Sequence, residues 1–268
     1  MSIIKETLEL ANGIRIPKIG YGTWQLFEGE HEKEIFKTAI RKGYRLIDTA
    51  AMYDNEVSVG RAIKESKVPR DELFVTSKLM FDVKTYDGAL EAFESTMRQL
   101  DLDYLDLYLI HAPAPIGESG AKYDNANITV WKAFEKLYEE GRIKAIGVSN
   151  FNERELTNLI EHTDIVPHVN QIPFHIGLDQ ESLLEFCTQK GILVEAYSPL
   201  DKGKVLKNKL VNDMAGKYGK TPAQMALRYI VERGVVPIPK TANPKRMDEN
   251  KALDFTLEEA DIEKLKTL

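Results

Sequence analysis

Short runs of apolar and β-branched residues alternate with longer segments of helical periodicity along most of the chain. A short apolar run predicts a buried strand, whereas apolar positions that recur every three or four residues predict a helix packed through one face. Eight such strand and helix pairs follow one another. The predicted strands are residues 19–22, 44–48, 73–78, 105–111, 144–149, 168–172, 193–197 and 235–239, and the predicted helices are residues 32–42, 56–66, 85–100, 130–140, 153–162, 181–190, 208–233 and one from about Pro244.

This alternation predicts a parallel sheet of the α/β class. Eight units within about 250 residues suit a closed (β/α)8 TIM barrel, because a doubly wound open sheet usually has fewer strands and a glycine-rich first turn. No GxGxxG or GxxxxGK[ST] motif follows the first strand. Gly43, Gly141 and Gly191 each follow a predicted helix, where a left-handed cap favours glycine.

A β-hairpin is expected ahead of the barrel, at residues 7–20. Two partly alternating apolar runs are joined there by Asn12-Gly13, the pair that suits a type I′ turn. No linker, low-complexity tract or composition break divides the chain, so we expect residues 1–268 to form one domain. The long connection 112–129, which follows the fourth strand, is expected on the rim where barrels keep their active sites.

Charge and cysteine content narrow the functional classes. The 268 residues include 36 Lys and Arg against 42 Asp and Glu, a net charge of −6, which argues against a broad surface for nucleic acid or an anionic membrane. Cys187 is the only cysteine, so no internal disulfide forms. With neither a signal peptide nor a membrane span in the sequence, we expect a cytoplasmic protein.

Four polar residues fall where the predicted strands end. Asp48, Lys78 and His111 close the second, third and fourth strands, and Tyr53 lies just past Asp48. Since the strand ends of a barrel converge on one mouth, the four side chains are expected to share a pocket. Taken singly, a strand-end Lys or Asp is more often part of a structural ion pair.

The four residues suit carbonyl reduction. An Asp holds a neighbouring Lys charged, and that ammonium favours a phenolate, so we expect the pKa of Tyr53 to fall below its usual value of about 10. Negative charge develops on a carbonyl oxygen when hydride reaches its carbon, and a phenol can then donate a proton to it. A neutral imidazole N–H can orient the same oxygen.

Long motifs identify a family resemblance. GYRLIDTAAMYDNEVSVGRAI, FVTSK, LYLIHAP, GVSNF, VNQIPFH, EAYSPL and IPKTANPKRMDEN occur in order, and together they resemble the aldo-keto reductase superfamily over residues 5–267. The resemblance implies the hairpin-capped (β/α)8 barrel. It also implies that Tyr53 is the general acid, that Lys78 and Asp48 are its partners, and that His111 orients the carbonyl.

The resemblance further implies NADPH, bound in an extended form without a Rossmann fold. It assigns the nicotinamide carboxamide to Ser149, Asn150 and Gln171, and ring stacking to Tyr197. The 2′-phosphate falls to Lys240, Thr241 and Arg246, a set whose cations suit a phosphate at a helix N-terminus. Further cofactor contacts are expected from Gly22, Thr23, Asp48, Ser198, Leu200, Glu249 and Asn250.

Departures from the family pattern concern the substrate. Met80 and Ala112 stand where the family commonly has Trp, while Trp24 keeps a third aromatic position. The substrate pocket, which the resemblance forms from Trp24, Tyr53, Met80, His111 and Ala112, is therefore expected to be wider. The histidines lack partners at metal-ligand spacing, so no metal is expected.

These observations predict an NADPH-dependent reductase that converts aldehydes or ketones, including keto-sugars and 2-oxoaldehydes, to alcohols, and that acts as a monomer without nucleic-acid or membrane partners. Two alternatives stay open. One is a Schiff-base aldolase with Lys78 as nucleophile, which Asp48 would oppose by favouring the ammonium. The other is a non-catalytic, cofactor-binding regulatory protein of the same fold. Such a protein would be expected to lack a member of the catalytic tetrad, which here is Asp48, Tyr53, Lys78 and His111.

Overall fold

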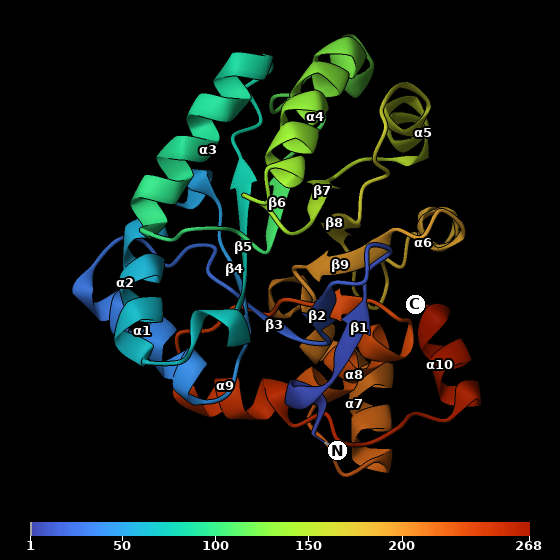
Figure 1. Ribbon diagram of the computed structural model, residues 1–268. Coiled ribbons are helices and arrows are strands. Elements are labelled where there is room, and N and C mark those ends of the chain that lie inside the picture. Colours follow the sequence, from blue (N-terminus) through green and yellow to red (C-terminus); the bar gives the residue numbers. More distant parts are fainter. Residues whose placement is uncertain (1) are drawn as a thin grey trace.

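The computed structural model describes residues 2–268 and places eight parallel strands in one sheet (Figure 1). Each strand pairs with the next one along the chain. The backbone N–H of Gly22 donates to Pro239 O at 3.2 Å, which brings the first and last strands together. The strands are β3 (Gly20–Gly22), β4 (Leu46–Asp48), β5 (Phe74–Leu79), β6 (Leu107–Ile110), β7 (Ile146–Ser149), β8 (Val169–Pro173), β9 (Leu193–Tyr197) and β10 (Val236–Pro237). The predicted (β/α)8 barrel is confirmed.

Helices surround the strands (Figure 1). Their apolar faces pack against the outward side chains of the barrel, among them Ile47, Val75 and Val148. The helices are α1 (Glu30–Arg41), α2 (Glu56–Ser66), α3 (Tyr86–Leu100), α4 (Asp124–Glu139), α5 (Glu153–His162), α6 (Glu181–Gln189), α7 (Lys209–Lys217), α8 (Pro222–Glu232), α9 (Pro244–Lys251) and α10 (Glu259–Lys266). Short 3-10 turns are η1 (Ile3–Lys5), η2 (Ala51–Tyr53), η3 (Arg70–Glu72), η4 (Gly120–Tyr123), η5 (Asp201–Gly203) and η6 (Val205–Lys207).

Two helical predictions need correction. Residues 208–233 form two helices, because Pro222 cannot continue a helix from before it and Thr221 caps a new one in a capping box with Gln224. Helix α4 begins at Asp124, ahead of the predicted position 130, so the connection after β6 is shorter than 112–129. The left-handed glycines predicted after helices are confirmed at Gly43, Gly141 and Gly191, with φ of 102°, 71° and 71°.

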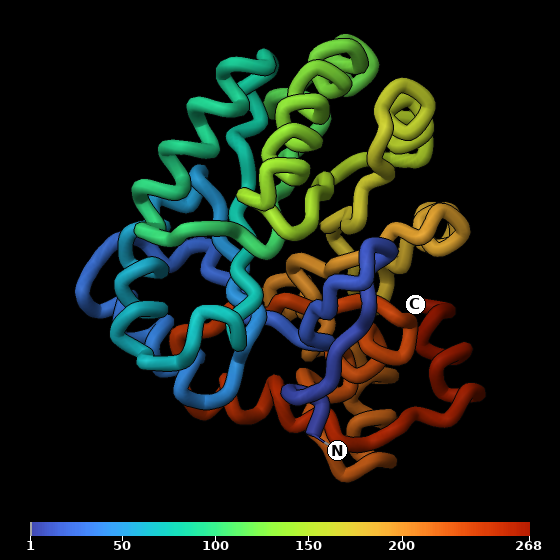
Figure 2. Tube along the Cα trace, in the orientation of Figure 1, coloured from blue at the N-terminus to red at the C-terminus, as the bar shows by residue number. Residues whose placement is uncertain are grey.

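The N-terminal hairpin closes the end of the barrel at which the strands begin, which we call the lower end. Its strands β1 (Thr7–Glu9) and β2 (Arg15–Pro17) are antiparallel, as predicted, with Glu9 opposite Arg15. The prediction of a type I′ turn is wrong, because that turn needs a positive φ at both Asn12 and Gly13 and only Gly13 has one. Asn12 Oδ1 instead accepts a hydrogen bond from Ile14 N. Figure 2 shows the start of the chain beside a segment of the C-terminal region. There, Ile3 N donates a hydrogen bond to Asp254 Oδ1 at 2.8 Å.

Alternation along the strands decides which side chains face the barrel interior. One core cluster inside the barrel contains alternate strand residues together with hairpin residues: Leu10, Ile16, Leu46, Phe74, Leu107, Leu109, Val169, Val236 and Ile238. Because side chains two residues apart share a face, inward positions nearer the strand ends include Asp48, Lys78, His111 and Gln171. Apolar packing fills the lower barrel, and polar residues line its carboxyl end.

Candidate active site

Tyr53 reaches the barrel mouth through a short turn after β4. It ends η2, where its N–H donates to Ala50 O, and the following Asp54 turns the chain in a left-handed conformation with φ of 51°. The turn places the phenol above the barrel opening. Lys78 Nζ lies 3.3 Å from Tyr53 OH and 4.9 Å from the centre of its ring.

Lys78 and Asp48 form a buried ion pair at the end of β4 and β5. Lys78 Nζ donates to both Asp48 carboxylate oxygens at 2.7 Å and to Thr49 O at 2.9 Å. The Lys78 side chain is 0% exposed and that of Asp48 3%. Thr23, directly after β3, supports the pair, since its N–H and its hydroxyl both donate to Asp48 O at 3.0 Å.

Burial and charge set the protonation states. Burial alone would lower the pKa of Lys78, but Asp48 and Tyr53 outweigh it and hold the pKa above its usual value, so the amine is an ammonium. A charged Lys78 argues against the aldolase, which needs the neutral amine as nucleophile. Burial also raises the pKa of Tyr53, and Lys78 only partly opposes this. The expected fall of the Tyr53 pKa is therefore wrong: desolvation outweighs the ammonium, and the phenol keeps its proton at neutral pH.

His111 faces Tyr53 from the end of β6. The two ring centres lie 5.7 Å apart in an edge-to-face arrangement. Burial, aided by the charge of Lys78, lowers the pKa of His111 to about 3, so its imidazole is neutral at physiological pH. Within residues 2–268 its Nδ1 is buried without a hydrogen-bond partner.

Gln171 joins the ion pair to a residue that the sequence analysis missed. Its Nε2 donates to Asp48 Oδ2 at 2.8 Å and to Glu195 Oε2 at 2.9 Å. Glu195 is 0% exposed, and burial, together with the charge of Asp48, raises its pKa to about 8. A carboxylate at an inward position of the apolar run LVEAY is the signal that could have revealed it.

Ser149, Asn150 and Tyr197 form a hydrogen-bonded group beside the tetrad. Asn150 Nδ2 donates to His111 O and to Ser149 Oγ, both at 3.0 Å, and its Oδ1 accepts from Tyr197 OH at 2.8 Å. Ser149 Oγ donates in turn to Gln171 O at 2.8 Å. Asn150 follows β7 directly and has a φ of 63°, so the backbone turns sharply and aims its amide back towards β6.

The rim over Tyr53 is partly apolar and open. Trp24 is 43% exposed and stands 4.9 Å from Tyr53, ring centre to ring centre. Met80 and Ala112 are half-buried. The loop after β6 is held by Lys84, whose Nζ donates to Ala112 O at 3.1 Å and to the Asn127 side chain at 2.9 Å.

A second group of predicted residues lies around the start of α9. Lys240 and Arg246 are exposed, as is the neighbouring Lys245, whose N–H donates to the capping Asn243 side chain. None of Lys240, Lys245 and Arg246 forms an ion pair within residues 2–268. By contrast, Lys251 at the end of α9 pairs with Asp248 at 3.2 Å. Unpaired cations beside a helix N-terminus fit the phosphate of the NADPH that the sequence resemblance implies.

Five more of the predicted cofactor residues, Ser198, Leu200, Thr241, Glu249 and Asn250, make no hydrogen bond or ion pair with the tetrad in the described part of the chain. Thr241 is buried, and its carbonyl accepts from Tyr21 OH at 2.6 Å. Asn250 is also buried, whereas Glu249 is half-buried. Beyond β9, Ser198 is exposed in a left-handed conformation, and Leu200 packs partly against the core.

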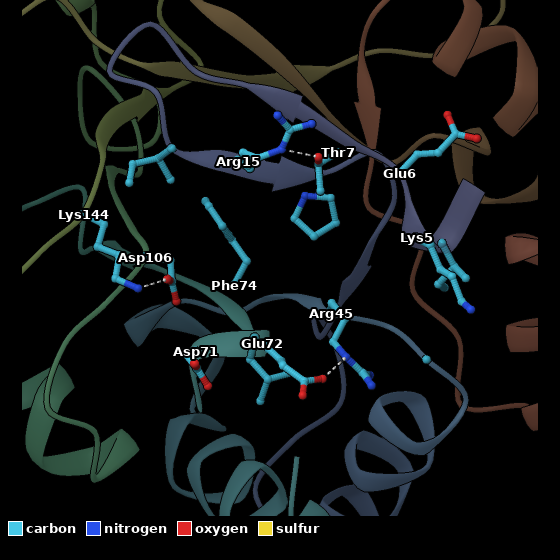
Figure 3. A pocket seen from close by; sticks show the side chains of 15 residues that line it. Lys5, Glu6, Thr7, Arg15, Arg45, Asp71, Glu72, Phe74, Asp106 and Lys144 are labelled. Atoms are coloured by element: carbon cyan, nitrogen blue, oxygen red, sulfur yellow. Dashed lines mark hydrogen bonds and ion pairs between the residues drawn. The ribbon is translucent and has the colours of Figure 1, made fainter. Parts of the chain in front are cut away.

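A cavity of about 570 Å³ lies at the opposite end of the barrel, between the hairpin and the starts of the strands (Figure 3). Two ion pairs form among its lining residues, Lys144 with Asp106 at 3.2 Å and Arg45 with Glu72 at 3.7 Å. In barrels this end serves stability. In residues 2–268 no group of three His, Cys, Asp or Glu is placed to hold a metal ion, and no helix there has the length and apolar character to span a membrane.

Comparison with known proteins agrees with this geometry. The family model "Aldo/keto reductase family" matches residues 18–268. The chain is 44% identical over 266 residues to glyoxal reductase from Bacillus subtilis, a match that covers 99% of this chain and 93% of the relative. It is 41% identical to the 9,11-endoperoxide prostaglandin H2 reductase of Trypanosoma cruzi, over 97% of this chain and 90% of that protein.

Solved structures give the same result. An aldo/keto reductase from Brucella melitensis superposes with a TM-score of 0.91 at 40% identity, with 98% of each chain covered. A Bombyx mori aldo-keto reductase in complex with NADP has a TM-score of 0.88 at 33% identity, with coverage of 98% of this chain and 92% of that one. Sequence, barrel and mouth residues lead to one conclusion: the chain belongs to the aldo/keto reductase family.

Proposed function

We propose that Tyr53 donates the proton in the reduction of aldehydes and ketones to alcohols by this protein. Membership of the family makes the chain an oxidoreductase that depends on NADPH. NADPH, when bound, supplies the hydride that adds to the carbonyl carbon. The observation that carries the proposal is the contact of Lys78 Nζ with Tyr53 OH at 3.3 Å, while Asp48 holds the same ammonium through two hydrogen bonds.

The tetrad divides the work at the carbonyl oxygen. Tyr53 keeps its proton at neutral pH, so the phenol is ready to donate when negative charge develops on that oxygen. As the proton leaves, Lys78 stabilises the phenolate that forms at its oxygen. Asp48 keeps Lys78 charged and in place without touching the substrate.

His111 takes the role of orienting the carbonyl. With a pKa lowered to about 3, its imidazole is neutral and carries one N–H that can donate to the oxygen. A neutral donor fixes the substrate without competing with Tyr53 for delivery of the proton. Asn150 Nδ2 donates a hydrogen bond to the backbone carbonyl of His111. Asn150 therefore connects the site of the substrate carbonyl with the residues assigned to the nicotinamide.

For the cofactor, we assign the 2′-phosphate to Lys240, Thr241 and Arg246, and this assignment predicts a preference for NADPH over NADH. Lys240 and Arg246 support it, because both are exposed, form no ion pair within residues 2–268 and can bind an added phosphate. Gln171 Nε2 is used by two carboxyl groups, whereas its Oε1 has no hydrogen-bond partner in residues 2–268. We assign that oxygen to the NH2 group of the nicotinamide carboxamide.

The open rim suits a range of aldehydes better than a single substrate of closely matched shape. Trp24 offers one exposed aromatic face, whereas Met80 and Ala112 are half-buried and bring no aromatic ring to the rim. Glyoxal reductase and aldehyde reductase are among the names of the similar proteins. We therefore propose small 2-oxoaldehydes and aromatic aldehydes as substrates.

The test is NADPH consumption by the purified protein with methylglyoxal, an aromatic aldehyde and a keto-sugar, alongside NADPH binding without substrate. The expected result is turnover of at least one aldehyde, with an alcohol as product. Binding without turnover of any of the three would favour the regulatory alternative. Carbon–carbon bond formation or cleavage without NADPH would favour the aldolase.

A further inference from the structure

Glu195 is a buried carboxyl group that the carbonyl chemistry does not use. It lies on β9 directly opposite Gln171 on β8, as register partners in the parallel pair. It is fully buried, and its Oε1 has no hydrogen-bond partner in residues 2–268, so its one polar contact through the other oxygen is with Gln171. A carboxyl group buried in the barrel at this cost calls for a role.

The orientation of the Gln171 amide follows from two hydrogen bonds, one to Asp48 and one to Glu195. Asp48 and Glu195 each present an oxygen to one end of that amide, at 2.8 and 2.9 Å from Nε2. The ionised Asp48 oxygen can only accept a hydrogen bond, so the NH2 end of the amide faces it and the carbonyl end faces away. Glu195 Oε2, as the carbonyl oxygen of a neutral carboxyl group, accepts from the second N–H. With only Asp48 as acceptor, one of the two N–H groups would lose its partner.

We propose that Glu195 is a positioning residue for the cofactor: it locks the Gln171 amide so that Oε1 is presented to the carboxamide NH2 of the nicotinamide. The inference rests on the proposed function, because that assigns Gln171 to the carboxamide. Glu195 itself acts through Gln171 and touches neither cofactor nor substrate.

The protonation of Glu195 agrees with this role. With its pKa raised to about 8, the group is neutral at physiological pH, so Lys78 and Asp48 remain a balanced pair with no added buried charge. A neutral carboxyl still accepts from Gln171 through its carbonyl oxygen. Glutamine can supply the same acceptor in the same volume, and methionine can fill the volume but cannot accept.

The experiment compares two cofactors by calorimetric titration without substrate. One is NADP+, and the other is its 3-acetylpyridine analogue, in which a methyl ketone replaces the carboxamide and no NH2 is present. The proteins are wild type, Glu195→Met and Glu195→Gln. Glu135→Met is the matched control, because Glu135 is also a buried carboxyl but accepts from the backbone N–H groups of Asp164 and Ile165.

In the wild type we expect NADP+ to bind about tenfold more tightly than the analogue, which corresponds to one good hydrogen bond. Glu195→Met should weaken NADP+ by about the same factor and leave the analogue unchanged, so the preference disappears. Glu195→Gln should keep it. Glu135→Met should lower the melting temperature and keep the preference.

Two results would overturn the role of Glu195: equal weakening of both cofactors by Glu195→Met, or a preference that survives in that variant. A wild type without any preference would overturn it too. Failure of the proposed function is seen separately, since a protein that reduces no carbonyl compound can still show or lack this preference in binding.

Discussion

Replacing Lys78 with methionine removes the one cation that contacts Asp48 in residues 2–268, and leaves that carboxylate buried with hydrogen bonds only from Gln171 to its side chain. Removing one partner of a buried ion pair typically costs about 3–5 kcal/mol. The lower end of that range applies, since Gln171 still donates to Asp48. For a chain of this length, about 3 kcal/mol corresponds to a fall in Tm of roughly 10 °C.

The double variant separates loss of charge pairing from loss of packing. Asp48→Asn in the Lys78→Met background removes the stranded charge, so we expect it to recover about 2 kcal/mol of the free energy of unfolding. Urea unfolding at pH 7 measures this, with unchanged slope as the condition for comparison. The control is Lys209→Met, whose exposed pair with Asp213 should contribute less than about 1 kcal/mol.

The same substitution also affects catalysis. Lys78 is the group that opposes the effect of burial on Tyr53, so its loss should raise the pKa of the phenol further and lower kcat. An unfolding free energy within about 1 kcal/mol of wild type for Lys78→Met, or additive effects of the two substitutions, would refute the buried-pair reasoning.

Three further predictions concern pH and cofactor choice. The pKa of His111 is lowered to about 3, so its contribution to stability is present above pH 6.5 and is lost as pH falls towards 3; His111→Gln should lose less stability in urea unfolding between pH 6.5 and 4. Burial raises the pKa of Glu56 to about 7, so its contribution is present below pH 4.5 and is lost as pH rises through 7; Glu56→Gln, which keeps an acceptor for Ser77, should flatten that decline, and an unchanged decline would contradict the assignment. Lys240→Ala and Arg246→Ala should each raise KM for NADPH about tenfold and change KM for NADH little; equal effects on both would contradict a phosphate contact.

The tetrad could be placed from sequence because strand geometry fixes it. In β4, β5 and β6, apolar residues alternate inward, and Asp48, Lys78 and His111 continue the same parity at the ends that converge in a barrel. Tyr53 was harder to place by residue pattern alone, since η2 and the left-handed Asp54 set its position. The family motif supplied what the strand pattern lacked.

Other features depend on three-dimensional packing that a pattern does not contain. The direction of the Tyr53 pKa shift depends on the balance between burial and the charge of Lys78, and only the charge can be read from the sequence. Glu195 could not be assigned a role from the sequence, because it lies within an otherwise apolar strand segment and its contact with Gln171 appears only in the folded structure. The hairpin turn differed because Asn12 uses its side chain to accept from Ile14 N rather than adopting a positive φ.

The most direct test of the account is Tyr53→Phe, measured for NADPH binding, stability and aldehyde reduction together. Lys78 keeps its hydrogen bonds to Asp48 and Thr49 in this variant, so the fold and cofactor binding should be nearly unchanged. If Tyr53 donates the proton, kcat should fall by about 10²–10⁴-fold, the typical contribution of a positioned proton donor. Turnover within about threefold of wild type, with the same NADPH affinity, would contradict Tyr53 as the proton donor.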